Sequence, residues 1–355
     1  MLTYTHLRPE LYTAWNDFCI GNSDAWFYHT THYIDYLVEC NPSVRNLSFM
    51  VTENGNVLAV CSLFLENGKF SIGDSYVWAP AVARDLGSRK QEQVRRKSFE
   101  VIDSLAIFCN VTKCSLSIDP LSHPQYNYLM RFGYIPTSIN TQIVSLEPSL
   151  RTLKSQLSKG HDYDVDVGIK TLETKIFTSQ NITQSVFDKY HSLHTKDAGR
   201  ETRDLKSWNM ILDWIQAGHA ILLQANLSGR DIGYSCVITY KDSSYYGSAC
   251  SDPEYPDLPI GHALTWATIG YLKEHNFQWY EIGWQHYTEQ PYDHCSQKEI
   301  SISKFKRGFG GITVPLFRGE KYYSRDLFMK EYTERMERYA EGLRKDTAIG
   351  AESSV

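Results

Sequence analysis

One order of predicted elements occurs twice along the chain: two helices, a β-hairpin, a third strand, a helix and a closing strand. In the first half, the apolar pattern predicts helices near residues 9–20, 31–40 and 91–109, and strands at 47–52, 57–65, 69 onward, 113–118 and 139–146. In the second half it predicts helices near 183–196, 205–216 and 259–275, and strands at 220–226, 232–240, 244–250, 279–283 and 312–317. An element order that recurs without recurring residues indicates two lobes built on one α+β plan.

Turn residues mark the boundaries of the predicted elements. Asn54-Gly55 and Ser228-Gly229 each lie between two apolar runs, which is typical of hairpins. We place the seam at Glu147-Pro148, so that residues 1–147 form the first lobe and residues 148–325 the second. Residues 326–355 are expected to form a terminal helix as far as 345, followed by a frayed tail.

Composition excludes several classes of protein. The formal net charge of -5 argues against a DNA-binding protein. No apolar run approaches the roughly 18 residues of a membrane span, and the first residues do not resemble a secretory signal. The eight cysteines are scattered without a C-x-x-C pair, which favours reduced thiols and a cytoplasmic location.

The chain carries no sequence motif of the common catalytic families. It has no G-x-S-x-G, no P-loop and no G-x-G-x-x-G, so the serine-hydrolase, ATPase and dinucleotide classes lose support. His286, Glu289, Asp293, His294 and Cys295 lie close together in sequence, but their spacing matches no standard zinc site, and no metal is expected.

Three stretches nevertheless resemble a known family. Ser117–Pro120, followed by 129–134 and then Gln142, resembles the end of the first lobe in Fem-like (FemABX-type) double-GNAT transferases. The stretch 303–311 (SKFKRGFGG) resembles the F-K-x-G-F-G-G segment near the end of these proteins. The stretch 193–208 resembles a subgroup that is often found with surface-polysaccharide genes. The resemblance covers most of the chain and implies two tandem GNAT-like lobes, each with a mixed, mostly antiparallel sheet flanked by helices.

The same resemblance implies an acyltransferase that joins an activated acyl group to an amine. It implies a donor that is aminoacyl-tRNA or acyl-CoA, no bound cofactor, and an acceptor that is a nucleotide-sugar or another cell-envelope precursor. Two segments depart from the pattern. Residues 159–166 contain three aspartates where the family has a basic run. These negative charges argue against tRNA binding by this segment. Residues 251–262 are rich in acids and prolines just before a predicted helix, which makes a poor pyrophosphate cradle and disfavours acyl-CoA.

Three residues are the catalytic candidates, because acyl transfer to an amine needs a polarised carbonyl and a path for protons. Lys306 offers a fixed positive charge for the developing oxyanion, with a structural salt bridge as its alternative role. Tyr246, on a predicted strand, can bind the acceptor or protonate the leaving group, with core packing as the alternative. Asp119 follows a buried-looking strand and is either a general base or a turn-capping residue.

The substrate-binding candidates are basic or aromatic residues at the predicted ends of helices and strands in the second lobe. They are Arg200, Arg203, His262, Trp284, His286, Lys304 and Arg307. Strand alternation would place Lys304 and Lys306 on one face and Arg307 on the other. We expect the acceptor in a cleft between the lobes. The alternatives are an acyl-CoA-dependent amino-sugar N-acetyltransferase and a catalytically inactive double-GNAT binding protein.

Overall fold

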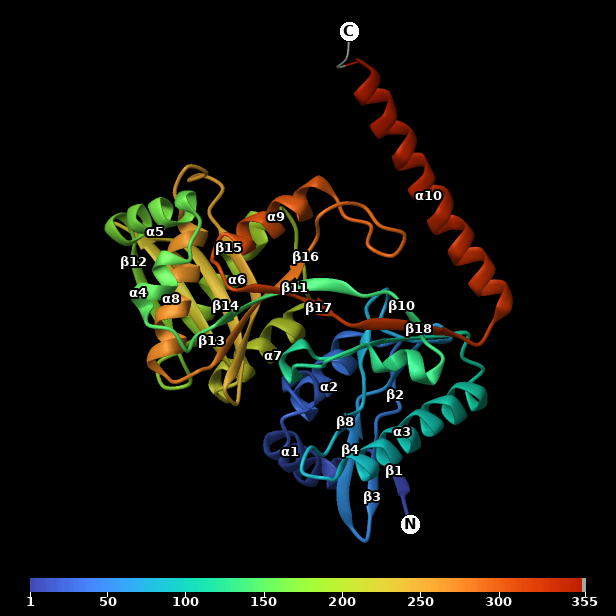
Figure 1. Ribbon diagram of the computed structural model, residues 1–355. Coiled ribbons are helices and arrows are strands. Elements are labelled where there is room, and N and C mark those ends of the chain that lie inside the picture. Colours follow the sequence, from blue (N-terminus) through green and yellow to red (C-terminus); the bar gives the residue numbers. More distant parts are fainter. Residues whose placement is uncertain (353–355) are drawn as a thin grey trace.

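The computed structural model describes residues 1–352, with side chains through residue 343. Two lobes of mixed sheets and flanking helices lie side by side, and a long terminal helix projects from them (Figure 1). The predicted α+β class is therefore confirmed. Within residues 1–352, no helix combines the length and the apolar content that a membrane crossing requires.

The first lobe is built on two sheets. Its helices are α1 (Tyr12–Gly21), α2 (Thr31–Cys40) and α3 (Ser88–Phe108), with short 3-10 turns η1 (Pro9–Leu11), η2 (Phe27–His29), η3 (Pro120–Ser122) and η4 (Tyr128–Phe132). Its strands are β1 (Thr3–His6), β2 (Arg45–Asn46), β3 (Phe49–Glu53), β4 (Asn56–Cys61), β5 (Phe64–Glu66), β6 (Lys69–Phe70), β7 (Val77–Trp78), β8 (Ala81–Val82), β9 (Lys113–Ser117) and β10 (Ile135–Pro136). The prediction of a single strand at 57–65 is wrong. The strand is interrupted at residues 62–63, and β4 and β5 belong to different sheets.

The second lobe is built on one sheet with the order β12-β13-β14-β15-β16-β11-β17. Its strands are β11 (Ile139–Ser145), β12 (Glu173–Phe177), β13 (Ala220–Leu227), β14 (Arg230–Tyr240), β15 (Ser243–Ser251), β16 (Trp279–Gln285) and β17 (Ile312–Leu316). Its helices are α4 (Leu150–Ser155), α5 (Lys159–Thr171), α6 (Gln184–Ala198), α7 (Leu205–Gln216), α8 (Ile260–Glu274) and α9 (Gln297–Arg307).

Two strands cross between the lobes. β11, which we predicted to close the first lobe, lies between β16 and β17 of the second. In return β18 (Arg318–Tyr322), from the far end of the chain, lies between β10 and β9 of the first (Figure 1). The division at residues 147 and 148 stays a prediction, and the two seven-stranded sheets each contain a strand from the other side of it.

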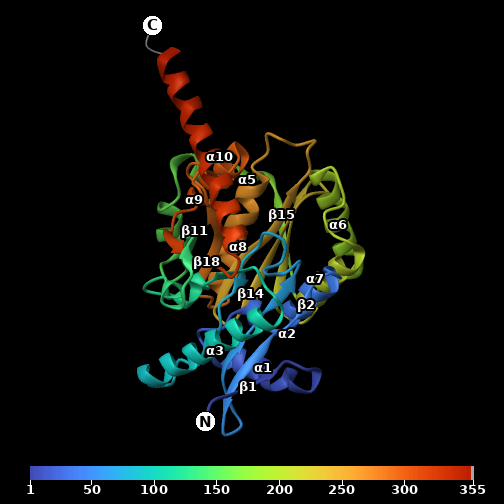
Figure 2. The same ribbon diagram turned by 90° about the vertical axis from the view of Figure 1, so that its right-hand side faces the viewer.

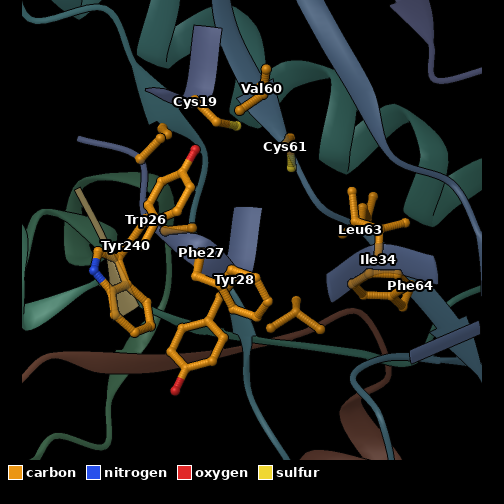
Figure 3. Packing of buried hydrophobic residues seen from close by; sticks show 14 of the residues in the cluster. Cys19, Trp26, Phe27, Tyr28, Ile34, Val60, Cys61, Leu63, Phe64 and Tyr240 are labelled. Carbon is orange, nitrogen blue, oxygen red and sulfur yellow. The ribbon is translucent and has the colours of Figure 1, made fainter. Parts of the chain in front are cut away.

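The lobes also share a core. The larger of two apolar clusters contains residues from both lobes, and the second cluster lies within the second lobe and includes residues of α8. The ring centre of Phe27 lies 6.2 Å from that of Tyr240 and 5.0 Å from that of Trp214, both in the second lobe. Figure 3 shows Phe27 and Tyr240 in this core. Lys241 adds a polar link, since its ammonium donates to the carbonyl oxygen of Asn22 at 2.7 Å. The contact between the lobes is therefore largely apolar.

The segment around Lys306 is helical, so the predicted strand alternation is wrong. A capping box begins α9, in which Ser296 accepts from the backbone N–H of Glu299 at 3.3 Å and the Glu299 carboxylate accepts from the backbone N–H of Ser296 at 2.7 Å. Residues two apart on a helix do not share a face. Lys304 is accordingly exposed, whereas Lys306 is half-buried.

The terminal helix α10 (Arg325–Glu352) is longer than predicted and runs away from the lobes (Figure 2). Its first turns are fixed to the first lobe, where Arg335 and Glu331 contact residues of β18 and β9. Residues 353–355 of the predicted frayed tail lie outside the described residues.

Candidate functional site

A cavity of about 530 Å³ lies between the lobes. Its walls are mainly aromatic, and the rings come from both lobes: Tyr28, Tyr33, Tyr36, Tyr76 and Trp78 from the first, and Tyr190, Trp214, Tyr245 and Trp284 from the second. The rings of Tyr28 and Trp78 stack at 4.8 Å with an interplanar angle of 2°. The volume and the apolar walls are those of a small-molecule site.

Glu281 is the most buried carboxyl group in the cavity wall, with 4 % of its surface exposed. It lies on β16, and its Oε1 accepts a hydrogen bond of 2.6 Å from the hydroxyl of Thr141 on β11. No other hydrogen bond to this carboxyl group is formed by the described residues. Burial raises the pKa of Glu281 to about 8, and the bond from Thr141 offsets only part of that rise. Without a bound cation the carboxyl group therefore holds a proton at neutral pH, whereas a cation beside it favours the ionised form.

The two parallel strands β15 and β16 separate beside the cavity. They pair only from Ser243 to Tyr245 on β15 and from Trp279 to Glu281 on β16, although both strands continue. Beyond that point β15 has a bulge at Gly247, and β16 has one next to Gly283, whose φ is +105°. The gap between the strands, here called the strand opening, has facing edges that lack ladder partners.

The ammonium group of Lys306 lies at the strand opening. It is 5.7 Å from the ring centre of Tyr246 on β15, and a Cβ atom added to Gly283 on β16 would lie 2.9 Å from it. The same added Cβ would lie 3.6 Å from the hydroxyl of Tyr245, which lines the cavity. Among the described residues, no carboxylate forms a salt bridge with Lys306. Burial lowers the pKa of Lys306, and the nearby charge of Glu281 opposes that effect.

Two predicted binding residues, Arg203 and Trp284, line the cavity. The Arg203 guanidinium lies 5.1 Å from the ring centre of Trp208. Tyr246 is not in the cavity wall, because it packs on the opposite face of β15 from Tyr245, against the second apolar cluster. Arg200 and Lys304 are exposed and do not line the cavity.

Four further predicted residues lie away from the cavity wall, each with a local partner. Asp119 caps η3 by accepting from the backbone N–H of Leu121 at 3.0 Å, and burial raises its pKa to about 7. His286 lies 2.7 Å from the carboxylate of Asp293. Arg307 donates to the side chain of Gln285 at 2.8 Å. The fourth, His262, lies on α8. The expected roles of these residues stay predictions, and the structure gives each of them a structural partner.

The N-terminus of α8, where His262 lies, is covered by the chain itself. A Cβ atom added to Gly261 would lie 3.2 Å from the ring of Phe305. The His262 imidazole lies 3.5 Å from the carboxylate of Asp164, and its ring centre is 4.5 Å from that of His161. A helix N-terminus attracts phosphate only when its N–H groups are accessible. Side chains and a carboxylate occupy that position here.

Sequence reasoning missed Glu281 and the first-lobe aromatic residues. Glu281 is a carboxylate in the middle of an otherwise apolar strand (WYEIGWQ), and that contrast was a usable signal. Tyr28 and Trp78 become cavity residues only when the two lobes meet, so no local pattern predicts them. Across the described residues, no group of three or more His, Cys, Asp or Glu side chains is arranged to hold a metal ion.

Comparison with known proteins supports the fold. Residues 166–293 match the family described as an acetyltransferase (GNAT) domain. FemX is similar in structure, with a TM-score of 0.68 and 12% identity over 93% of this chain and 100% of that one. L-PGS from Bacillus licheniformis gives a TM-score of 0.59 and 12% identity over 93% and 97% of the two chains.

A tandem GNAT protein from the clavulanic acid biosynthesis pathway gives a TM-score of 0.51 and 13% identity over 91% of this chain and 99% of that one. No curated protein matches the sequence significantly. The fold is the double-GNAT fold, and the resemblance to Fem-like proteins is confirmed at that level.

Proposed function

We propose that this chain, a double-GNAT protein with the fold of FemX, is an N-acyltransferase. It moves an acyl or aminoacyl group from an activated donor to an amine of an acceptor held in the cavity between the lobes. The observation that carries this proposal is Lys306, whose ammonium has no salt-bridge partner among the described residues and lies at the strand opening, beside Gly283.

The strand opening suits the acyl carbonyl of the donor. Its unpaired backbone edges can donate to a carbonyl oxygen, and the Lys306 ammonium adds a positive charge at the same place. Preorganised donors and charges of this kind stabilise the oxyanion that forms when an amine attacks a carbonyl. The acceptor amine would approach from the cavity, past Tyr245.

The covered N-terminus of α8 supports a donor other than acyl-CoA. The ring of Phe305 lies against Gly261 in the first turn of α8, and Asp164 adds a negative charge beside the imidazole of His262. Aminoacyl-tRNA is the donor that we favour, and acyl-CoA is the competing one.

The cavity suits an acceptor that carries a phosphate and a ring. Aromatic side chains supply flat apolar walls, and Arg203 and Arg318 supply guanidinium groups that match phosphate oxygens. A nucleotide-sugar or another cell-envelope precursor with a free amine has both features.

The test is acyl transfer by Lys306→Met beside Lys304→Met. The two lysines lie two residues apart on α9, but Lys304 is exposed. Purified protein is incubated with UDP- and CMP-amino sugars and with aminoacyl-tRNA or acetyl-CoA, and acylated products are measured by mass spectrometry. Lys306→Met should lower kcat by about 10²–10³-fold, as removal of an oxyanion donor does, whereas Lys304→Met should leave it unchanged.

Two results would contradict the proposal. Equal activity of Lys306→Met and wild type would remove Lys306 from the reaction. Binding of an acceptor without turnover for any donor would favour the inactive binding protein. Transfer from acetyl-CoA alone would keep the enzyme and overturn the donor.

A further inference from the structure

Two residues of the cavity wall, Glu281 and Ser117, each have a side-chain oxygen without a hydrogen-bond partner among the described residues, and that of Ser117 is fully buried. The second oxygen of Glu281 accepts no hydrogen bond from the described residues, since Thr141 bonds only Oε1. Ser117 lies on β9 of the other lobe and has 4 % of its surface exposed. Its hydroxyl group forms no hydrogen bond with the described residues. Both residues line the cavity. Buried polar groups without partners are rare in folded proteins, and in a cavity they indicate a ligand that supplies the missing donors.

Glu281 and the aromatic side chains of the cavity can bind a positive group, while Arg203 and Arg318 are the cations of the same wall. The titratable groups that interact with this carboxyl group are Asp119, Lys306, Tyr28 and Tyr245. Aromatic faces attract an ammonium ion, and a carboxylate bonds it strongly. A neutral amide offers neither the charge nor the three N–H donors of an ammonium group.

We propose that Glu281 receives the acceptor amine as an ammonium ion, so that the acceptor is a primary amine on a sugar-sized ring. Acylation removes the positive charge, and the neutral product therefore leaves the cavity. This inference rests on the proposed N-acyl transfer and assigns a specificity-determining role to Glu281, a residue that the sequence did not indicate.

The reaction balances with one proton released. The ammonium nitrogen gives a proton to the Glu281 carboxylate, and the free amine attacks the acyl carbon to form the C–N bond. The bond from the acyl carbon to the leaving group breaks, and the leaving group takes the proton from Glu281. The second proton of the new amide nitrogen goes to solvent.

The test is a binding measurement that needs no turnover. Glucosamine, N-acetylglucosamine and glucose share one ring and differ at a single substituent, and their dissociation constants are measured by saturation-transfer NMR titration. Wild type should bind glucosamine at least about tenfold more tightly than the other two, which corresponds to about 1.4 kcal/mol. Glu281→Gln, which preserves side-chain shape, should reduce that ratio to about one.

Asp74→Asn is the matched control, because Asp74 also lines the cavity but is exposed. It changes the charge by the same amount and should leave the ratio unchanged. Equal binding of the three sugars, no detectable binding of glucosamine, or the same loss in Asp74→Asn would each overturn the inference.

Lys306→Met separates this inference from the proposed function. It should lower the rate of transfer by about 10²–10³-fold and keep the preference for glucosamine. Transfer that persists unchanged in Glu281→Gln would overturn the role of Glu281 and leave the N-acyltransferase standing. A glucosamine preference that depends on Glu281, without transfer from any donor, would support the ammonium site and count against the enzyme.

Discussion

Glu281 and Glu320 are two glutamates buried almost equally, with 4 % and 2 % of their surfaces exposed. Their surroundings differ. Glu320, on β18, accepts from Arg335 at 2.8 and 2.9 Å, from Tyr76 at 2.9 Å, and lies 2.8 Å from the Lys113 ammonium. Burial alone would raise the pKa of Glu320, but the bonds from Arg335 and the charge of Lys113 outweigh it and hold the pKa at about 2. Glu281 has one hydrogen bond, and its pKa is raised to about 8.

The difference separates a structural carboxylate from a functional one. The charged partners of Glu320 come from β9 and α10, so the charge network joins the terminal helix to the first lobe. Nothing in the described part of the chain compensates Glu281 in that way, and it lines a cavity. A strongly shifted buried carboxyl group in a cavity is a candidate for function. A buried carboxyl group without charged partners lowers the free energy of unfolding, and a ligand that compensates its charge can restore that stability.

The largest expected effect is the loss of the Glu320 network. Glu320→Gln should lower the free energy of unfolding by about 3–5 kcal/mol, because the buried Lys113 and the half-buried Arg335 would then share the single carboxylate of Glu331. Urea denaturation at pH 7, followed by tryptophan fluorescence, measures the change. The control is Glu92→Gln, which breaks the more exposed pair with Arg131 and should cost less than about 1 kcal/mol. Equal effects in the two variants would contradict the structural role of Glu320.

The same network sets the response to acid. The pKa of Glu320 in the folded state is about 2, below its ordinary value of 4.5. Its contribution is therefore complete above pH 4.5 and is lost as the pH falls toward 2. The difference in stability between wild type and Glu320→Gln should narrow over that range.

Glu281→Gln should act in the opposite direction. The folded pKa of about 8 exceeds the ordinary 4.5, so the buried carboxyl group costs stability as the pH rises from 4.5 through 8. At pH 5 the variant should be within about 1 kcal/mol of wild type, and between pH 5 and pH 9 it should gain about 4 kcal/mol relative to wild type. Urea denaturation at pH 5, 7 and 9 measures both values, with Asp74→Asn, at an exposed position, as the control. A destabilised variant at pH 9 would mean that Glu281 has a structural partner.

The sequence predicted most elements because their signals are local. The bounds of α2 and α7 agree with the predicted helices at 31–40 and 205–216, where apolar spacing and caps act within the element. Helix α9 was missed although its capping box, Ser296 with Glu299, is visible in the sequence. The exchange of β11 and β18 has no local signal, because it depends on which distant strand each one meets.

The residues of the candidate site likewise fall into those that the sequence predicted and those that depend on distant contacts. The motif resemblance indicated Lys306, and helix-loop chemistry indicated Arg203, which lines the cavity. Glu281 and Thr141 are 140 residues apart in sequence, and their contact exists only because β11 pairs with β16. The chemistry of a residue can therefore be predicted from its type, whereas its partners depend on the fold.

The smallest expected change in stability is that of Thr141→Val, which removes the hydrogen bond to Glu281 and so tests the contrast with Glu320. Thr141 is fully buried, and its hydroxyl makes the hydrogen bond of 2.6 Å to Glu281. Valine keeps the shape and removes the donor. At pH 5 the carboxyl group is neutral, and the loss should be about 1 kcal/mol. At pH 9 the bond is charge-assisted, and the loss should be about twice as large, which raises the pKa of Glu281 further. A loss that is the same at both pH values would show that Thr141 does not support the ionised carboxylate, and Glu281 would then lack even one partner for its charged form.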